Sequence, residues 1–306
     1  MKEPLHHYVR PGIVHFMAYP VIKGEGPIIE SLTELLADRF FEVIEISWIK
    51  DPDVRAEAKK LLESSGVSVK YGAQPRLLTQ KLDLNSLDSS ARASAVDEMR
   101  AGIDEAAELG ITDFALLSGP YPGDADRNAA MDALTTSLNE VCAYAGDHGM
   151  NVALEVFDRD IDKKCLIGPA ADAREIAERV KATHANFGLL VDLSHIPLLR
   201  ESPAEALRPV ADHLVHIHIG NAYMDDHADP AYGDMHPRFG YPGGANDVPE
   251  LVAFLDELFN IDYLKTDGSA RAAVSFELKP VGDENPRTLI ANGQRKLVEA
   301  WSKVNG

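Results

Sequence analysis

Short runs of β-branched and other apolar residues recur along the chain, and a longer stretch with helical spacing of its apolar positions follows each run. Strands that alternate with helices in this way are typical of a parallel α/β protein. The runs with the length and composition of buried strands are residues 12–18, 42–48, 67–71, 113–118, 151–157, 188–193, 214–220 and 272–278. The pattern therefore predicts eight consecutive βα units.

Capping residues mark several boundaries between these elements. Asp51-Pro52 and Ser202-Pro203 each place a capping side chain before a proline at the first helical position. Gly66, Gly110 and Gly149 stand where helices are expected to end.

Two folds accommodate such a chain, a closed barrel and an open doubly wound sheet. The open sheet normally carries a glycine-rich phosphate loop after its first strand, whereas residues 18–26 read AYPVIKGEG. We therefore predict an α/β fold, a single (β/α)8 TIM barrel over residues 1–306. The connections 119–126 and 221–246 are unusually long, and the second, after strand seven, is expected to form a lid or a substrate wall.

Ionisable residues occupy positions where a barrel interior should be apolar. Strand side chains alternate between the helices and the interior, and in the last four predicted strands the apolar set fits the side that faces the helices. The interior set then contains Glu155, Asp192, His216, His218 and Glu277, all pointing toward the same end of the barrel. These strands contain no Lys or Arg that could neutralise the carboxylates.

A divalent cation is the simplest way to hold three carboxylates there, because unpaired buried carboxylates are strongly unfavourable. Three carboxylates with an imidazole form an oxygen-rich donor set that favours Mn²⁺ or Mg²⁺, with Co²⁺ or Zn²⁺ as alternatives. Each residue alone is compatible with a structural role, a glutamate as a hydrogen-bond acceptor and His216 as a packed or supporting histidine. The metal hypothesis depends on the convergence of four consecutive strands.

These residues fall into motifs that resemble the xylose-isomerase-like TIM barrel superfamily, the sugar phosphate isomerase/epimerase family. Strand five contains ALEVFDRD with Glu155, strand six leads into VDLSHIPL with Asp192 and His195, strand seven contains VHIHIGN, and strand eight contains SFELKP. The resemblance covers nearly the whole chain and implies one metal bound by Glu155, Asp192, His218 and Glu277. It also implies that Glu155 and Glu277 exchange protons with the substrate and that His195 contacts a substrate oxygen.

The resemblance implies a metal-dependent isomerase or epimerase of a keto-sugar or sugar derivative. A hydrogen α to a carbonyl is too weakly acidic for an unaided carboxylate, whereas a metal that chelates the carbonyl and a neighbouring hydroxyl stabilises the enediolate. One of Glu155 and Glu277 would remove the proton and the other would return it. Return to the next carbon gives isomerisation, and return to the opposite face of the same carbon gives epimerisation.

Other activities stay open. An enediolate can expel a β-substituent, and some barrels of this kind cleave 3-keto-C-glycosides together with a small partner subunit; the stretch HIGN…YGDMHPRFG…PGG resembles them. Zinc endonucleases of the same superfamily carry a D-x-H motif, and Asp234 and His236 match it. Together with His195 they could hold a second metal. However, the histidines that those enzymes use at strands three and four are missing from this sequence. A metal- or sugar-binding barrel without catalysis is a further alternative.

Some candidate substrate contacts lie outside the strand motifs. His236 is expected to organise the lid or to touch substrate, and Arg238, in the same long connection, is a candidate anion contact. Arg159 and Lys279 are candidates for the same role, although each charge is equally compatible with solvent or a salt bridge. Trp48, at the end of strand two, would form either a sugar-stacking wall or part of the core.

Composition narrows the partners and the compartment. The chain carries 30 Lys and Arg against 49 Asp and Glu, and the net charge of −19 disfavours a nucleic-acid partner. No apolar stretch is long enough for a membrane span, the first residues lack the apolar core of a secretory signal, and two cysteines cannot build a disulfide framework. We expect a cytoplasmic homo-oligomer with a carbohydrate substrate, joined by a small partner subunit if it is a lyase.

Overall fold

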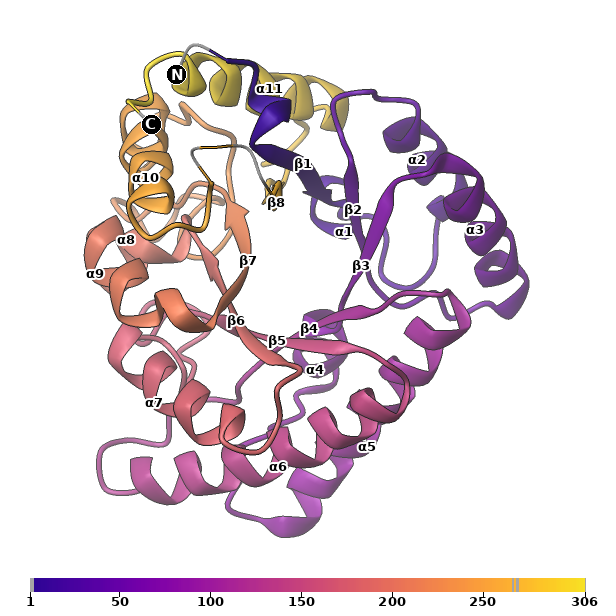
Figure 1. Cartoon of the computed structure of the whole chain (residues 1–306), viewed down its shortest axis with the longest axis vertical. Helices are drawn as coiled ribbons and strands as arrows, with labels where there is room; N and C mark the ends of the chain where they lie inside the picture. The colour runs from indigo at the N-terminus through magenta and orange to yellow at the C-terminus, as the bar shows by residue number, and fades with distance from the viewer. Residues whose placement is uncertain (1–2, 266, 268–269, 306) are drawn as a thin grey trace.

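Eight parallel strands close into the predicted barrel, in the order β1-β2-β3-β4-β5-β6-β7-β8. The computed structural model describes residues 3–265, 267 and 270–305; the ends of the predicted 1–306 domain lie outside these. Figure 1 shows the strands around the centre and the helices outside them. The strands are β1 Val9–Val14, β2 Val43–Ile46, β3 Ser68–Gly72, β4 Asp113–Leu117, β5 Asn151–Val156, β6 Phe187–Asp192, β7 Leu214–Ile219 and β8 Ala272–Phe276.

Helices cover the outside of the barrel, and their ends follow the capping signals. Asp51 accepts hydrogen bonds from the backbone N–H groups that open α3, Ser202 forms a capping box with Glu205, and Gly66 ends α3 at φ 73°. The α-helices are α1 His15–Ala18, α2 Ile28–Leu36, α3 Pro52–Ser65, α4 Gln74–Gln80, α5 Ser89–Glu108, α6 Arg127–Asp147, α7 Ala170–Lys181, α8 His195–Leu199, α9 Pro203–Leu207, α10 Val248–Asn260 and α11 Pro286–Trp301, with 3₁₀ turns η1 Leu5–His7 and η2 Arg208–His213.

The first strand is the one whose predicted position was wrong. The apolar run 12–18 predicted a strand, but β1 covers Val9–Val14 and the chain then turns into the short helix α1. Helix α1 buries His15 and Ala18. A short apolar run is compatible with either a strand or a helix, so the boundary at Val14 is set by packing rather than by the local pattern.

The barrel interior differs between its two ends. Ala115, Ala153 and Gly188 lie side by side in the register of β4, β5 and β6 and face inward. Because these residues are small, a cavity of about 290 Å³ opens at the amino end of the strands, where Lys70 and Asp113 form an ion pair at 3.3 Å. The carboxyl end instead carries the large polar side chains described below.

The long connection between β7 and α10 folds back onto the barrel. The Asn246 amide donates hydrogen bonds to the carbonyls of Leu193 (3.2 Å) and Gly220 (3.0 Å), which ties the end of the connection to the strand ends. As a result, Asp234 and His236 are buried near the barrel axis, with 6% and 2% of their surfaces exposed.

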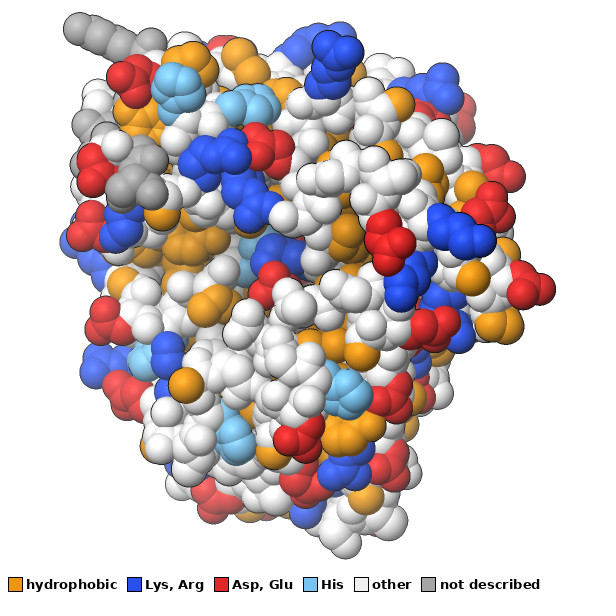
Figure 2. All heavy atoms as spheres, turned by 45° about the vertical axis from the view of Figure 1, so that its right-hand side comes forward, with side chains coloured by type: hydrophobic (Ala, Val, Ile, Leu, Met, Phe, Trp, Pro, Cys, Tyr) orange, Lys and Arg blue, Asp and Glu red, His pale blue; other side chains and the backbone are white. Residues whose placement is uncertain are grey.

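The face of the molecule drawn in Figure 2 carries side chains of both charges. On the face that Figure 2 presents, Asp and Glu side chains are interspersed with Lys and Arg side chains. Near the two ends of the chain, which Figure 1 marks, the Trp301 indole donates to the Glu3 carbonyl at 2.9 Å. None of the helices in the described part of the chain combines the length and the apolar character that a membrane span requires.

Candidate active site

Four buried side chains meet at the carboxyl end of the strands. Glu155 lies near the end of β5, Asp192 ends β6, His218 lies on β7, and Glu277 directly follows β8. Each offers an atom that lies within 4.8 Å of the atoms offered by the others. The structure therefore brings together the four residues that the sequence predicts as metal ligands.

The oxygens of this cluster fit a divalent cation. Gln74 donates its amide N–H to Glu155 Oε2 at 2.7 Å, and the Ser194 backbone N–H donates to Asp192 Oδ1 at 2.7 Å. The second oxygens, Glu155 Oε1 and Asp192 Oδ2, are buried without a hydrogen-bond partner among the described residues. Buried polar atoms are normally satisfied, so free carboxylate oxygens beside an imidazole indicate a place for a cation with oxygen-rich ligands.

A glutamate behind the cluster holds the imidazole of His218. His218 Nε2 lies 3.0 Å from Glu45 Oε2, and His218 Nδ1 lies 2.7 Å from Glu277 Oε2. Burial alone would lower the pKa of His218, but Glu45 and Glu277 outweigh it and raise that pKa well above its usual value. Glu45 also contacts His216 Nε2 at 2.6 Å, so His216 takes the supporting position that the sequence left as its alternative.

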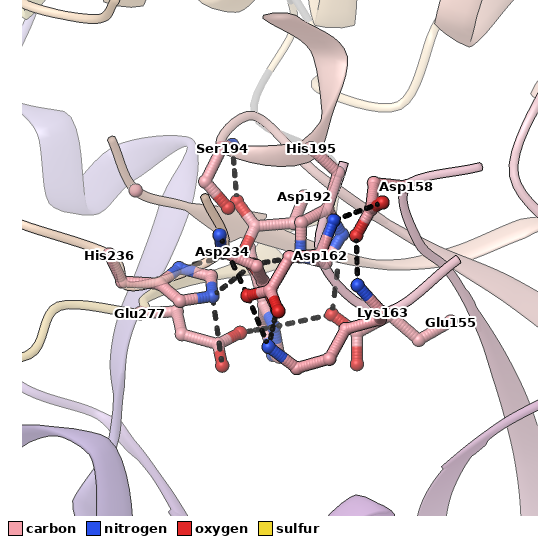
Figure 3. Close-up of polar contacts among 12 residues, drawn as sticks. Glu155, Asp158, Asp162, Lys163, Asp192, Ser194, His195, Asp234, His236 and Glu277 are labelled. Carbon is pink, nitrogen blue, oxygen red and sulfur yellow. Dashed lines mark hydrogen bonds and ion pairs between the residues drawn. The ribbon is translucent and has the colours of Figure 1, made fainter. Parts of the chain in front are cut away.

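A second cluster is centred on Asp234. Figure 3 shows His195, His236 and Lys163 around its carboxylate. His195 Nε2 and His236 Nε2 lie 2.9 and 2.7 Å from Asp234 Oδ1, and Lys163 Nζ lies 3.0 Å from Oδ2. Burial raises the pKa of Asp234, but the positive charges of His236 and Lys163 outweigh burial and hold it well below the usual range.

His195 is held with both ring nitrogens occupied. Its Nδ1 lies 2.7 Å from the Val156 carbonyl and its Nε2 faces Asp234, and both partners are acceptors. Burial lowers the pKa of His195, yet Asp234 more than compensates and raises it well above its usual value. His195 is only 1% exposed, and the arrangement makes it a donor that fixes Asp234.

A single buried carboxylate, that of Asp158, holds the loop after β5 that carries Lys163. Asp158 is fully buried and accepts hydrogen bonds from the backbone N–H groups of Ile161, Asp162, Lys163 and Lys164. These bonds, drawn in part in Figure 3, fix the turn of the loop. The Lys163 ammonium is then bound by Asp162 Oδ2 at 2.9 Å as well as by Asp234.

A cavity of about 250 Å³ opens onto both clusters. Glu155, His218, Glu277 and His236 line its polar part, whereas Phe16, Leu78, Phe157 and Met235 line its apolar part. A concave site with apolar walls and a few convergent polar groups is typical of a small-molecule site.

Of the four predicted substrate contacts, His236 belongs to this lining, whereas His195, Trp48 and Arg238 lie outside it. Trp48 lines a neighbouring cavity of about 60 Å³, with Lys50 and Arg76 over its ring at 4.9 and 5.2 Å. Arg238 Nε lies 2.9 Å from Glu284 Oε1, and its Nη1 donates to the Gly240 carbonyl. Contacts between substrate and Trp48 or Arg238 rest on the sequence alone.

Sequence reasoning missed Glu45, Gln74, Lys163 and the buried Asp158. Glu45 had a usable signal, since it is an interior position of the predicted strand 42–48. Gln74 opens helix α4 and Lys163 lies in a connection, so strand alternation does not indicate the direction of either side chain.

Comparison with known proteins identifies the family. A family model described as xylose isomerase-like TIM barrel matches residues 34–270, and the chain belongs to this family. A search of curated proteins gave no significant match.

Several solved structures share the fold over nearly the full length. An L-ribulose 3-epimerase is 19% identical, with 96% of each chain covered and a TM-score of 0.73. The IOLI protein with a binding zinc atom is 15% identical, with 96% of this chain and 99% of that chain covered and a TM-score of 0.72. The 3-keto-D-glucoside 4-epimerase YcjR from E. coli is 17% identical, with 96% and 98% covered and a TM-score of 0.64.

Proposed function

We propose that this protein is a metal-dependent isomerase or epimerase of a keto-sugar or sugar derivative. The observation that carries the proposal is that two glutamates, Glu155 and Glu277, share one buried cluster with Asp192 and His218 and line the same cavity. The family, and the similar fold of proteins described as L-ribulose 3-epimerase and 3-keto-D-glucoside 4-epimerase, support it.

Glu155, Asp192, His218 and Glu277 would hold the metal, for which we propose Mn²⁺ first because the donor set is rich in oxygen. When bound, the ion would act as a Lewis acid on the carbonyl of the substrate, which makes the neighbouring C–H bond more acidic.

The two glutamates are placed to move the proton. Gln74 donates to one oxygen of Glu155, and the other, Oε1, is buried with no hydrogen bond among the described residues and lies 3.7 Å from His218 Nδ1. Oε1 is therefore the atom suited to accept a proton. Glu277 approaches from the end of β8, with Oε2 bound by His218 and Oε1 lying 3.8 Å from His236 Nε2. A base and an acid on different strands allow the proton to be removed by one carboxylate and returned by the other.

The walls of the cavity favour this proton transfer. Phe16, Leu78 and Phe157 present apolar surface around the carboxylates. Exclusion of water strengthens electrostatic interactions in the cavity and limits loss of the proton to solvent.

The test is exchange of deuterium from D₂O into a panel of ketopentoses and ketohexoses, followed by NMR. In Glu155→Gln and Glu277→Gln, exchange should fall by at least roughly 100-fold, because an amide of nearly the same shape cannot accept the proton. Glu299→Gln, which alters an exposed carboxylate that is paired with Lys303, is the matched control. Exchange at the wild-type rate in both cavity variants would remove these glutamates from the mechanism.

Cleavage of a 3-keto-glycoside is the second candidate, and it rests on the sequence stretch HIGN…YGDMHPRFG…PGG, which resembles enzymes that cleave 3-keto-C-glycosides. An assay of aglycone release from 3-keto-glycosides, with and without any small polypeptide that co-purifies, separates it from epimerisation. The nuclease alternative is disfavoured because the Lys163 ammonium lies 3.0 Å from Asp234 Oδ2, where a second cation would bind.

A further inference from the structure

Lysine side chains gather at the cavity of a strongly acidic protein. The net charge is −19, yet Lys163 and Lys279 both line the cavity, and Lys23 lies near enough for its charge to act on Lys279. Like charges repel one another, so each ammonium in such a group requires a compensating anion.

Lys163 has its anions within the protein. Its ammonium lies 2.9 Å from Asp162 Oδ2 and 3.0 Å from Asp234 Oδ2. Those carboxylates outweigh burial and raise the pKa of Lys163 well above its usual value. Lys163 is therefore compensated before any substrate binds.

Lys279 is held in place but forms no direct ion pair within the part of the chain that the structure describes. It follows Glu277 by two residues, and its backbone N–H donates to the His236 carbonyl at 2.7 Å, which fixes the chain beside the cavity. The polar contact recorded for its ammonium is Met235 Sδ at 3.9 Å, and among the described residues no carboxylate oxygen lies within 4.0 Å of it. A thioether is a weak acceptor, so this contact leaves the charge available.

Lys279 is half-buried, and the carboxylates whose charges act on it, Asp162 and Asp234, are already paired with Lys163. Its ammonium therefore has no direct ion pair among the described residues. A lysine that served only the fold would be expected either to reach solvent fully or to form an ion pair.

We propose that Lys279 forms a subsite for an anionic group of the substrate, a carboxylate or a phosphate carried by the sugar. The acid group would lie at Lys279, and the reacting carbonyl would lie at the cluster that contains Glu277. This inference rests on the proposed function for the sugar part of the substrate, whereas the charge at Lys279 stands on its own.

The test measures binding of three probes by isothermal titration calorimetry to the Mn²⁺-loaded protein: D-glucuronate, inorganic phosphate and D-glucose. At least one of the two anions should bind the wild type more tightly than glucose does, with an affinity that falls as salt rises. In Lys279→Met that affinity should fall by roughly 10- to 100-fold, the range for a hydrogen bond to a charged group, while Lys279→Arg should retain most of it. The anion that binds identifies the acid class.

Controls separate the subsite from general effects of charge and from the metal. Lys303→Met changes the net charge equally at an exposed lysine bound to Glu299, and it should bind the anions as the wild type does. If Lys279→Met unfolds, anion affinity is compared between Lys279→Gln and the wild type, together with the salt dependence of binding to the wild type. Anion binding that survives loss of the Lys279 charge, or equal binding of glucuronate, phosphate and glucose, would overturn the proposal.

The two experiments together distinguish a wrong subsite from a wrong activity. If deuterium exchange proceeds in neutral keto-sugars but the affinity for the anions does not depend on Lys279, the proposed subsite is wrong and the proposed activity stands. If the affinity for the anions depends on Lys279 but neither neutral nor acidic sugars exchange deuterium, the proposed subsite stands and the proposed activity is wrong.

Discussion

At the scale of single residues, Glu45 connects the metal-binding imidazole to the rest of the barrel. It lies between His216 Nε2 at 2.6 Å and His218 Nε2 at 3.0 Å. A carboxylate bound to the far nitrogen of a ligating histidine fixes the ring and selects its tautomer. Glu45 is therefore a positioning residue in our account, and its contribution should be visible in metal affinity.

Glu45→Gln should weaken Mn²⁺ binding by about 10- to 100-fold, the usual cost of losing such a partner. The variant keeps the shape of the side chain but loses its charge, so the His218 ring is held less firmly. Titration of metal-free protein with Mn²⁺ by calorimetry measures this, with the exposed Glu299→Gln as control. Equal affinity in Glu45→Gln and the wild type would show that Glu45 does not support the site.

The sequence could predict the cluster residues because strand alternation turns every second residue inward. Glu155, Asp192 and His218 follow this rule on β5, β6 and β7, and Glu45 follows it on β2 but stands in no motif. Gln74 and Lys163 could not be predicted in the same way. Gln74 opens helix α4 and Lys163 lies in a connection, and only the packed structure brings them to Glu155 and Asp234.

At the scale of elements, connections rather than strands build the second cluster. Residues 157–168 deliver Lys163, and the connection after β7 delivers Asp234 and His236. The sequence shows that such connections are long but not how they fold. Arg238, in the second of them, and Trp48, after β2, do not line the cavity, and their contacts with substrate stay predictions. The wrong position of β1 has a similar cause, since a short apolar run does not show where a strand ends.

Asp158→Asn should loosen the loop that presents Lys163. The replacement amide turns a donor toward backbone N–H groups that now bind the Asp158 carboxylate, and the expected loss is about 1–3 kcal/mol in the free energy of unfolding. Urea unfolding measures the loss, and the affinity for a substrate should fall with it.

Asp160→Asn is the matched control, because Asp160 belongs to the same loop but is exposed and contacts Arg200. It should change stability by less than about 0.5 kcal/mol, as expected for a surface substitution. Equal losses in both variants would show that the buried Asp158 has no special role.

At the scale of the whole molecule, the buried carboxylates at the centre of the barrel lower the stability of the metal-free fold. Glu155, Asp192 and Glu277 are buried side by side, and burial raises the pKa of Asp192. A cation bound to the folded state alone stabilises it by mass action, by about 2.7 kcal/mol at a concentration of 100 times Kd.

Saturating Mn²⁺ should therefore raise the Tm of the wild type by several degrees, and a chelator should reverse the rise. In Asp192→Asn the rise should be largely lost, even if removal of a buried charge makes the metal-free variant more stable than the wild type. Scanning calorimetry with and without Mn²⁺ measures both shifts. If Mn²⁺ raised the Tm of Asp192→Asn as much as it raises that of the wild type, the stabilising ion would bind elsewhere.

The most direct measurement is anomalous X-ray diffraction above and below the manganese absorption edge from crystals grown with Mn²⁺. Our account predicts one strong peak enclosed by Glu155, Asp192, His218 and Glu277. Diffraction from fully manganese-loaded protein with no peak at that position would contradict it.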